Sequence, residues 1–160
     1  GQNFGAHRYD RIKRITAICL GCVSVVGLVL GCAAYFAGKP LLSIYITDSD
    51  EAIAYGITRM MYICLPYFLC GIMDVMTGVM RGMGVSIIPM IITVLGVCVF
   101  RVGWIYSVFR IPEYHTLPVL YSSYPISWVI TFAVEIFVFL IIHRRIERKN
   151  NGATEPANAR

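Results

Sequence analysis

Charged side chains are scarce in this 160-residue chain: Asp, Glu, Lys and Arg make up 14% of it, whereas hydrophobic residues make up 58%. A soluble domain of this length needs far more charge to cover its surface. The mean hydropathy of +0.69 agrees with this composition. The lack of charge excludes a soluble globular domain and predicts an integral membrane protein.

A basic face is also missing, although the formal net charge is +5. The Lys and Arg residues lie at the ends of apolar runs, and they form no RNA-binding motif. We therefore expect no nucleic acid partner, and we interpret the basic residues as signals of membrane topology.

The chain has neither a secretory leader pattern nor an initiator Met, since Gly1 opens a polar, basic stretch. We therefore expect an N-terminally truncated piece of a longer protein. A disulfide framework is absent as well, because all six cysteines fall inside apolar runs. Cys19 and Cys22 have the spacing of a redox or zinc motif, but a reactive thiolate needs a polar setting. We expect this pair to pack within a helix, with no metal site and no resident cofactor.

Four apolar runs are long enough to cross a bilayer core of about 30 Å at about 1.5 Å per helical residue. They cover residues 15–36, 59–80, 85–109 and 119–142. The predicted fold class is therefore all-α, a polytopic membrane protein with four transmembrane helices. Its predicted parts are a basic loop at 1–14, the membrane part at 15–142 and a basic, disordered tail at 143–160.

The ends of these helices carry start and stop signals. Gly38 and Pro40 are typical of the residues just past a helix end. Asp48, followed three residues later by Glu51, predicts a capping box at the start of the second long helix. Pro66 lies inside that helix and predicts a kink, because proline has no backbone N–H.

A short basic turn, Arg81-Gly82-Met83-Gly84, joins the second and third runs into a hairpin. Its Arg81, Gly82 and Gly84, together with Pro66, are candidate hinge and turn residues. Most Lys and Arg near helix ends lie before the first run, in this turn and after the last run. By the positive-inside rule, both ends of the chain and the turn are expected to be cytoplasmic.

Asp74 lies at membrane depth near the end of the second run. A carboxylate inside a membrane is a functional-site hypothesis by default, so Asp74 is the leading candidate for binding a coupling ion or a substrate. The alternative is a structural role, in which a protonated Asp74 bonds to a neighbouring helix, with Thr77 as one partner.

Arg101 and Glu135 are the other ion-coupling or substrate-binding candidates at membrane depth. For Glu135 we favour the interpretation that its side chain reaches the membrane interface beside His143 and Arg144. Counting residues places Arg101 nearer the opposite end of the helices than the two acids. We therefore expect no simple Arg101–Glu135 ion pair; carbonyl groups or an acid elsewhere would bind the arginine.

Two pairs of small residues, Gly27-x-x-x-Gly31 and Gly78-x-x-x-Gly82, have the spacing that allows helices to approach closely. Membrane helices are rich in glycine, so the spacing alone does not identify a dimer interface. We expect both pairs to serve packing within the chain.

Three motifs occur in order along the chain: GQNFGAHRYDRIKR at its start, GVMRGMGVSIIPM across the turn, and YPISW from Tyr124 to Trp128. Together they resemble the carboxy-terminal lobe of the multidrug and toxic compound extrusion (MATE) family. The first is similar to the cytoplasmic loop before that family's ninth helix, and the second to its tenth-to-eleventh turn. The resemblance covers all but the tail. It implies that the four runs are helices nine to twelve of a twelve-helix, two-lobe transporter.

The resemblance implies export of organic, often cationic, compounds through a bacterial plasma membrane in exchange for protons or sodium ions, by alternating access. It implies as partners the organic substrate, membrane lipid, and an amino-terminal lobe with helices seven and eight. Sodium-coupled members carry an acid on the tenth helix. The turn motif places that acid nearer Cys70 than Asp74, one helical turn away on the same face.

Other functions remain open at this point. A flippase for lipid-linked sugars has the same architecture, and a cavity lined by Arg and Lys would favour it. A four-helix thiol oxidoreductase would need Cys19 and Cys22 at the outer face, whereas the predicted topology places them nearer the cytoplasmic end. A non-catalytic assembly subunit has no specific support. We expect a transporter and not an enzyme.

Overall fold

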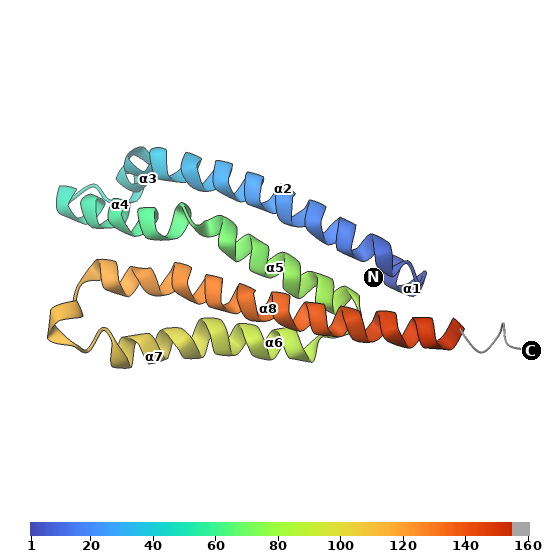
Figure 1. The fold of residues 1–160 in the computed structure, drawn as a ribbon. Helices are drawn as coiled ribbons and strands as arrows, with labels where there is room; N and C mark the ends of the chain where they lie inside the picture. The colour runs from blue at the N-terminus through green and yellow to red at the C-terminus, as the bar shows by residue number, and fades with distance from the viewer. Residues whose placement is uncertain (155–160) are drawn as a thin grey trace, which may run out of the picture.

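The computed structural model describes the backbone of residues 1–154 and the side chains of residues 1–148. Every regular element in the described range is a helix, which confirms the all-α fold class. Four long helical rods lie side by side (Figure 1). Each rod contains a helical stretch long and apolar enough to cross a membrane, so the four predicted spans are confirmed.

The first rod consists of a short helix α1 (Gln2–Gly5) and the long helix α2 (Tyr9–Phe36). α2 begins within the predicted basic loop, because Arg and Lys are good helix formers. Asp10 also lies in its first turn, at the positive end of the helix dipole. The predicted end near Gly38 is confirmed. Pro40 does not end helical structure, however: it lies in the first turn of α3 (Gly38–Tyr45), where a missing N–H costs no hydrogen bond.

The second rod begins with α4 (Asp50–Cys64), which is capped by a different residue from the one predicted. The Ser49 Oγ atom accepts a hydrogen bond from the Ala52 backbone N–H at 3.2 Å. The Asp48 carboxylate accepts instead from the Thr47 hydroxyl at 2.9 Å. The predicted Asp48–Glu51 capping box is therefore wrong: the extended backbone of Ser49 brings the serine hydroxyl to the open N–H groups of the first turn.

Pro66 breaks the second rod, as predicted. α4 ends at Cys64, and α5 (Tyr67–Gly82) begins directly after the proline. Proline lacks the N–H needed for the helical ladder, and its ring crowds the carbonyl four residues earlier. The break separates α4, which packs on α2, α3 and α8, from α5, which lies between α2 and α8.

The turn after α5 depends on a glycine in the left-handed region, since Gly84 has φ +82°. The Val85 N–H donates to the Met80 carbonyl oxygen at 3.0 Å across this turn, and so satisfies a carbonyl at the helix end. The predicted short turn is confirmed at this position.

The third rod is continuous but not uniform. α6 (Ile87–Thr93) and α7 (Phe100–Ser107) are joined by η1 (Val94–Val99), a π-helical segment. A π-helix bonds each residue to one five positions away and is therefore wider than an α-helix; such segments are frequent at functional sites. Gly96 of η1 lies so close to Thr131 of the fourth rod that a Cβ atom at this glycine would collide with the threonine hydroxyl.

A connection containing a 3-10 turn, η2 (Pro112–Tyr114), leads to α8 (Leu117–Thr154). α8 continues beyond residue 142, where the sequence predicted the membrane helix to end. The residues after His143 are mostly Arg, Glu and Lys, which are good helix formers. The remainder of the predicted disordered tail, residues 155–160, lies outside the described residues.

α5 and α8 form the centre of the bundle, with α2 and the α6–α7 rod on the outside (Figure 1). Gly27 and Gly31 of α2 lie against Phe68 and Cys64 of the second rod. A side chain at Gly31 would collide with the Cys64 carbonyl oxygen. Because lipid tails are as apolar as these side chains, close approach supplies the packing energy here. The prediction that this glycine pair packs within the chain is confirmed.

α1, the turn after α5 and the far end of α8 lie at one end of the bundle, while α3 and the connection between α7 and α8 lie at the other (Figure 1). The first end carries the basic residues that the sequence analysis identified as topology signals. A buried apolar cluster lies at this end and comprises Ile12, Met76, Met80, Met83 and Phe139.

Candidate functional site

Glu135 is completely buried, at 0% exposure, where α5, α6 and α8 meet. Its Oε1 atom accepts a hydrogen bond from the Thr77 hydroxyl at 2.7 Å. The Thr93 hydroxyl lies 3.3 Å from the same oxygen. The interpretation that Glu135 reaches the interface beside His143 and Arg144 is therefore wrong, because its carboxyl group is held between two threonines inside the helix bundle.

Glu135 belongs to a row of buried polar residues that the sequence analysis missed. Ser123, Ser127, Thr131, Glu135 and His143 are each no more than 3% exposed. They recur every four residues along α8, with buried Phe139 at the one apolar position, so they lie on one face of the helix. This spacing is visible in the sequence, and polar residues at every fourth position of an apolar helix would have identified α8 as buried.

Asp74, unlike Glu135, lies on the surface of the helix bundle. It is exposed on α5, and it forms no hydrogen bond or ion pair with any described residue. The predicted alternative of a bond to Thr77 is wrong, because Thr77 donates to Glu135. Within α5, the exposed positions are Tyr67, Asp74, Gly78 and Arg81.

These four exposed residues form the α5 stripe. They are spaced by three, four or seven residues, so they follow one side of the helix. The buried positions of α5, which include Met73, Met76 and Met80, lie on another side. Gly78 has no neighbour near its missing Cβ, so the predicted internal packing of this glycine is not seen among the described residues. The stripe gathers two charged side chains on a membrane-spanning helix.

Arg101 lies away from both acids, at the level of the YPISW motif. Its Nε atom donates a hydrogen bond to the Ser127 hydroxyl at 3.1 Å. Its guanidinium group stacks over the Tyr124 ring at 4.1 Å and lies 5.7 Å from the Trp128 ring centre. Ser127 precedes Glu135 by two helical turns, or about 12 Å. The expectation that Arg101 and Glu135 lie at different levels is therefore met.

A cavity of about 360 Å³ lies beside Arg101 and contains a second arginine, Arg59. Its wall also includes Ser123, Tyr121 and Tyr124 of α8. The Arg101 Nη2 atom is buried, and it has no hydrogen-bond partner among the described residues. The cavity therefore combines two cationic groups with aromatic surface, a combination that suits an anionic ligand.

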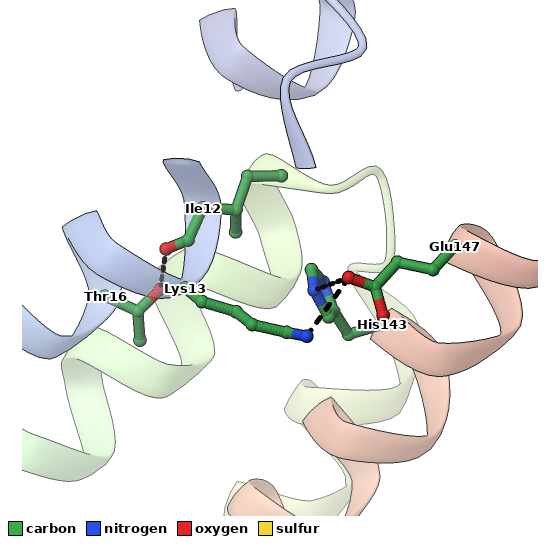
Figure 2. Close-up of polar contacts among 5 residues, drawn as sticks. All are labelled: Ile12, Lys13, Thr16, His143 and Glu147. Atoms are coloured by element: carbon green, nitrogen blue, oxygen red, sulfur yellow. Dashed lines mark hydrogen bonds and ion pairs between the residues drawn. The ribbon is translucent and has the colours of Figure 1, made fainter. Parts of the chain in front are cut away.

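At the basic end of the bundle, a small polar cluster links α2 to α8 (Figure 2). The Lys13 ammonium group lies 3.1 Å from Glu147 Oε1. His143 Nε2 lies 3.1 Å from the same oxygen, and its ring stacks on Phe139 with the ring centres 5.6 Å apart. The Lys13 and Glu147 side chains are 52% and 37% exposed, so solvent and salt screen their attraction.

Cys19 and Cys22 are free thiols on the exposed face of α2. Among the described residues, no group of three or more His, Cys, Asp or Glu side chains is placed to hold a metal ion. The features described at membrane depth are instead carboxyl, hydroxyl and guanidinium groups.

Four apolar helices with ionisable side chains at membrane depth define a multi-pass membrane protein in which the polar groups are concentrated on α5, α8 and Arg101 of α7. The chain belongs to the MatE family, whose model matches residues 1–106. This range includes the first two of the three motifs noted in the sequence, and the predicted family is confirmed. YPISW lies outside the matched range.

The chain is also similar to the probable multidrug resistance protein YoeA of Bacillus subtilis (strain 168). The two are 24% identical over 133 residues, which cover 81% of this chain and 28% of that protein. The chain therefore spans little more than a quarter of the length of this relative. No solved structure matches the chain.

Proposed function

We propose that the chain is part of a secondary-active exporter of organic, often cationic, compounds, driven by counter-transport of protons or sodium ions. The MatE family and the similarity to a probable multidrug resistance protein support this function. The single observation that carries it is the exposed Asp74 in the α5 stripe.

An exposed carboxyl group at membrane depth needs a polar surrounding. Facing lipid tails would cost an acidic side chain about 2.5–3.5 kcal/mol or more. The α5 stripe therefore faces a water-filled path or another part of the transporter. An acid on such a path binds a coupling ion or a cationic substrate. Transport then requires that the affinity of this acid differ between the inward-open and outward-open states.

The proposed setting is the plasma membrane of a bacterium, with both ends of the chain in the cytoplasm. Both the amino-terminal helices and the far end of α8 lie at the basic end of the bundle, which supports this orientation. A reporter fused after Arg148 should be active only in its cytoplasmic form, and one inserted near Glu113 only in its external form. The reverse pattern would contradict the orientation.

The test of the function is Asp74→Asn in the full-length transporter. Asn keeps the shape of the side chain but does not ionise, so insertion and folded yield should stay near wild type. Efflux of a fluorescent cation under an imposed proton or sodium gradient should fall at least tenfold. Glu113→Gln, which neutralises an exposed acid in the loop between α7 and α8, is the matched control and should transport normally. Wild-type efflux by Asp74→Asn under both gradients would refute the role of Asp74.

A second candidate function rests on the Arg59–Arg101 cavity. A cavity with two arginines favours the flippase for lipid-linked sugars, whose substrate carries a phosphate-linked head group. Arg101→Gln separates the two candidates. It should abolish translocation of a fluorescent lipid-linked sugar if the chain belongs to a flippase, and it should leave export of an organic cation largely intact if the chain belongs to an exporter.

A further inference from the structure

The buried carboxyl group of Glu135 is only partly satisfied. Its Oε1 atom receives the Thr77 hydroxyl, but its Oε2 atom is buried and has no hydrogen-bond partner among the described residues. The ion pairs formed by the described residues involve Lys13, His143 and Glu147 and do not include Glu135. No fixed positive charge therefore neutralises this carboxyl group within the described chain. An ionised carboxylate in such a place is costly, whereas a carboxyl group that has gained a proton is neutral.

The Thr77 hydroxyl bonds to a side chain on another helix, whereas the hydroxyls of three other helical threonines bond to their own backbone. Thr16, Thr93 and Thr131 each donate to the backbone carbonyl four residues earlier, which is the ordinary bond of a threonine in a helix. The Thr77 hydroxyl instead donates its hydrogen across to Glu135 of α8. This bond orients the Thr77 hydroxyl towards the carboxyl group.

The Thr93 hydroxyl, by contrast, has two possible acceptors. Its Oγ1 atom lies 2.9 Å from the Pro89 carbonyl oxygen and 3.3 Å from Glu135 Oε1. A hydroxyl carries one hydrogen, so it donates to only one of these oxygens at a time. When Glu135 is ionised, the negative oxygen is the stronger acceptor and draws the hydrogen away from Pro89. When Glu135 carries a proton on Oε1, it donates that proton to Thr93 Oγ1, and Thr93 donates its own hydrogen to Pro89.

Thr93 lies where a change of hydrogen-bond acceptor would affect the helix backbone. It is the last residue of α6, and the π-helical segment η1 begins at the next residue. η1 is held against α8 by the close contact of Gly96 with Thr131, which lies one turn before Glu135. A bond from a threonine to the carbonyl four residues earlier bends a helix. Forming or breaking the Thr93–Pro89 bond therefore acts on the junction between α6 and η1.

We propose that Glu135, Thr77 and Thr93 form a proton-binding site, in which proton gain by Glu135 directs the Thr93 hydroxyl to Pro89 and proton loss directs it to the carboxylate. One O–H bond forms or breaks at Glu135, and the proton comes from or returns to water. The proposal that this site binds a proton is based on the geometry of these three residues. Its role as the coupling step rests on the proposed export function.

Other titratable groups near the site are few. α5 carries Cys70, Asp74 and Arg81, the third rod between Ile87 and Val99 carries Cys98, and α8 carries His143 two turns beyond Glu135. Asp74 lies one turn from Thr77 and is the other acid at this depth. It is the group whose own titration could be mistaken for that of Glu135, so Asp74→Asn is the necessary control.

Infrared difference spectroscopy of the purified full-length transporter tests the proposal, because the C=O stretch of a protonated carboxyl group reports proton binding without transport. Wild type should show a band from a buried protonated carboxyl group that disappears reversibly as the pH rises. Glu135→Gln should lose this band, and Asp74→Asn should keep it. Thr93→Val should keep the band but shift its frequency, because the hydrogen bond from the carboxyl group is lost.

Amide hydrogen exchange tests the link to the third rod. After correction for the intrinsic pH dependence of amide exchange, the protection factors of residues 90–99 should change with pH in wild type and in Asp74→Asn. They should stay constant with pH in Glu135→Gln and in Thr93→Val. Thr16→Val, which removes a buried hydroxyl bonded only to its own helix, is the matched control and should behave as wild type.

Three infrared results would overturn the proposal: a band that persists in Glu135→Gln, the absence of a titrating band in wild type, or loss of the band when sodium replaces choline at constant pH. The last result would show a site that binds a metal cation instead of a proton. A transporter that shows the titrating band but exports no organic cation contradicts the proposed function alone and leaves the proton site in place.

Discussion

Asp74 and Glu135 carry the same functional group on neighbouring helices, yet their surroundings differ completely. Asp74 is exposed and has no polar partner in the described chain, whereas Glu135 has no exposed surface and is bound by the Thr77 hydroxyl. Hydropathy treats the two acids alike. Their difference shows that the surroundings of an intramembrane acid depend on which side of its helix it occupies.

In the two proposals above, Asp74 and Glu135 have different roles in the transporter. An exposed acid on the α5 stripe is accessible to a substrate or an ion that moves along a path. The buried acid at the junction of three helices is proposed to bind a proton, and its ionisation is proposed to change the hydrogen bonds between those helices. The proposals therefore assign binding from the path to Asp74 and control of helix packing to Glu135. The predictions below test this division, from the largest expected effect to the smallest.

Introducing a lysine should separate the acids most strongly. Glu135→Lys places an ammonium group in a closed apolar site, where the neighbouring hydroxyl hydrogens point towards it. Burying an unpaired charge costs several kcal/mol. We expect the folded yield of the full-length protein to fall more than tenfold. Asp74→Lys should fold nearly normally, because its position is exposed. Fluorescence-detected gel filtration in detergent measures both yields, and equal losses for the two variants would contradict the division.

Removing one hydroxyl should have an intermediate effect. Thr77→Val removes the donor to Glu135 and leaves the buried Oε1 atom with a weaker partner, at a cost of about 1–3 kcal/mol. Thr77→Ser restores the hydroxyl and should recover most of the stability. Thr16→Val is the control, since its hydroxyl bonds only within α2. Thermal unfolding of the detergent-solubilised protein should rank the variants in this order; a smaller loss for Thr77→Val than for Thr16→Val would show that the Thr77–Glu135 bond contributes little.

Arg101 is intermediate between the two acids in exposure and should respond accordingly. Arg101→Lys keeps the charge but loses the planar stacking on Tyr124 and the bond from Nε to Ser127, at a cost of about 1 kcal/mol. Thermal unfolding should show a loss smaller than that of Thr77→Val. If Arg101→Lys lowers thermal stability by the same amount in a protein that also carries Tyr124→Leu, stacking on Tyr124 is not the cause of the loss.

The Lys13–Glu147 pair should matter least. Both side chains are substantially exposed, and an exposed ion pair contributes about 0–1 kcal/mol. Lys13→Ala should therefore change thermal stability by less than Thr77→Val does. The loss should shrink further at high salt. A large loss of thermal stability that does not depend on salt would contradict this prediction. It would mean that the pair holds α2 against α8 despite its exposure.

Much of the architecture was accessible from the sequence because it depends on local composition. Runs of apolar residues long enough to cross a bilayer predict four helices without any knowledge of their packing. Pro66 interrupts a helix wherever it occurs, and Gly84 permits a left-handed turn that other residues disfavour. The Ser49 cap was missed because two adjacent residues, Asp48 and Ser49, both satisfy the local preference for an N-cap.

The environment of each charged residue could not be predicted from the sequence in the same way. Asp74 and Glu135 both interrupt apolar runs, and nothing within either run shows what the neighbouring helix presents to it. The polar row along α8 would have indicated burial on that face. It would not have identified Thr77 and Thr93 as the partners, because these lie 58 and 42 residues away in sequence.

The sequence by itself determined the class of the protein, the number of its membrane spans, the positions of its breaks and turns, and the family to which it belongs. These properties depend on hydropathy, on proline and glycine backbone chemistry and on short motifs, all of which are local. Only the tertiary structure decided which acid is buried and which is exposed, and which hydroxyl reaches the buried one. The rotation of each helix about its own axis is set by close packing against neighbours far away in the chain, where a glycine replaces a side chain or a hydroxyl finds an acceptor.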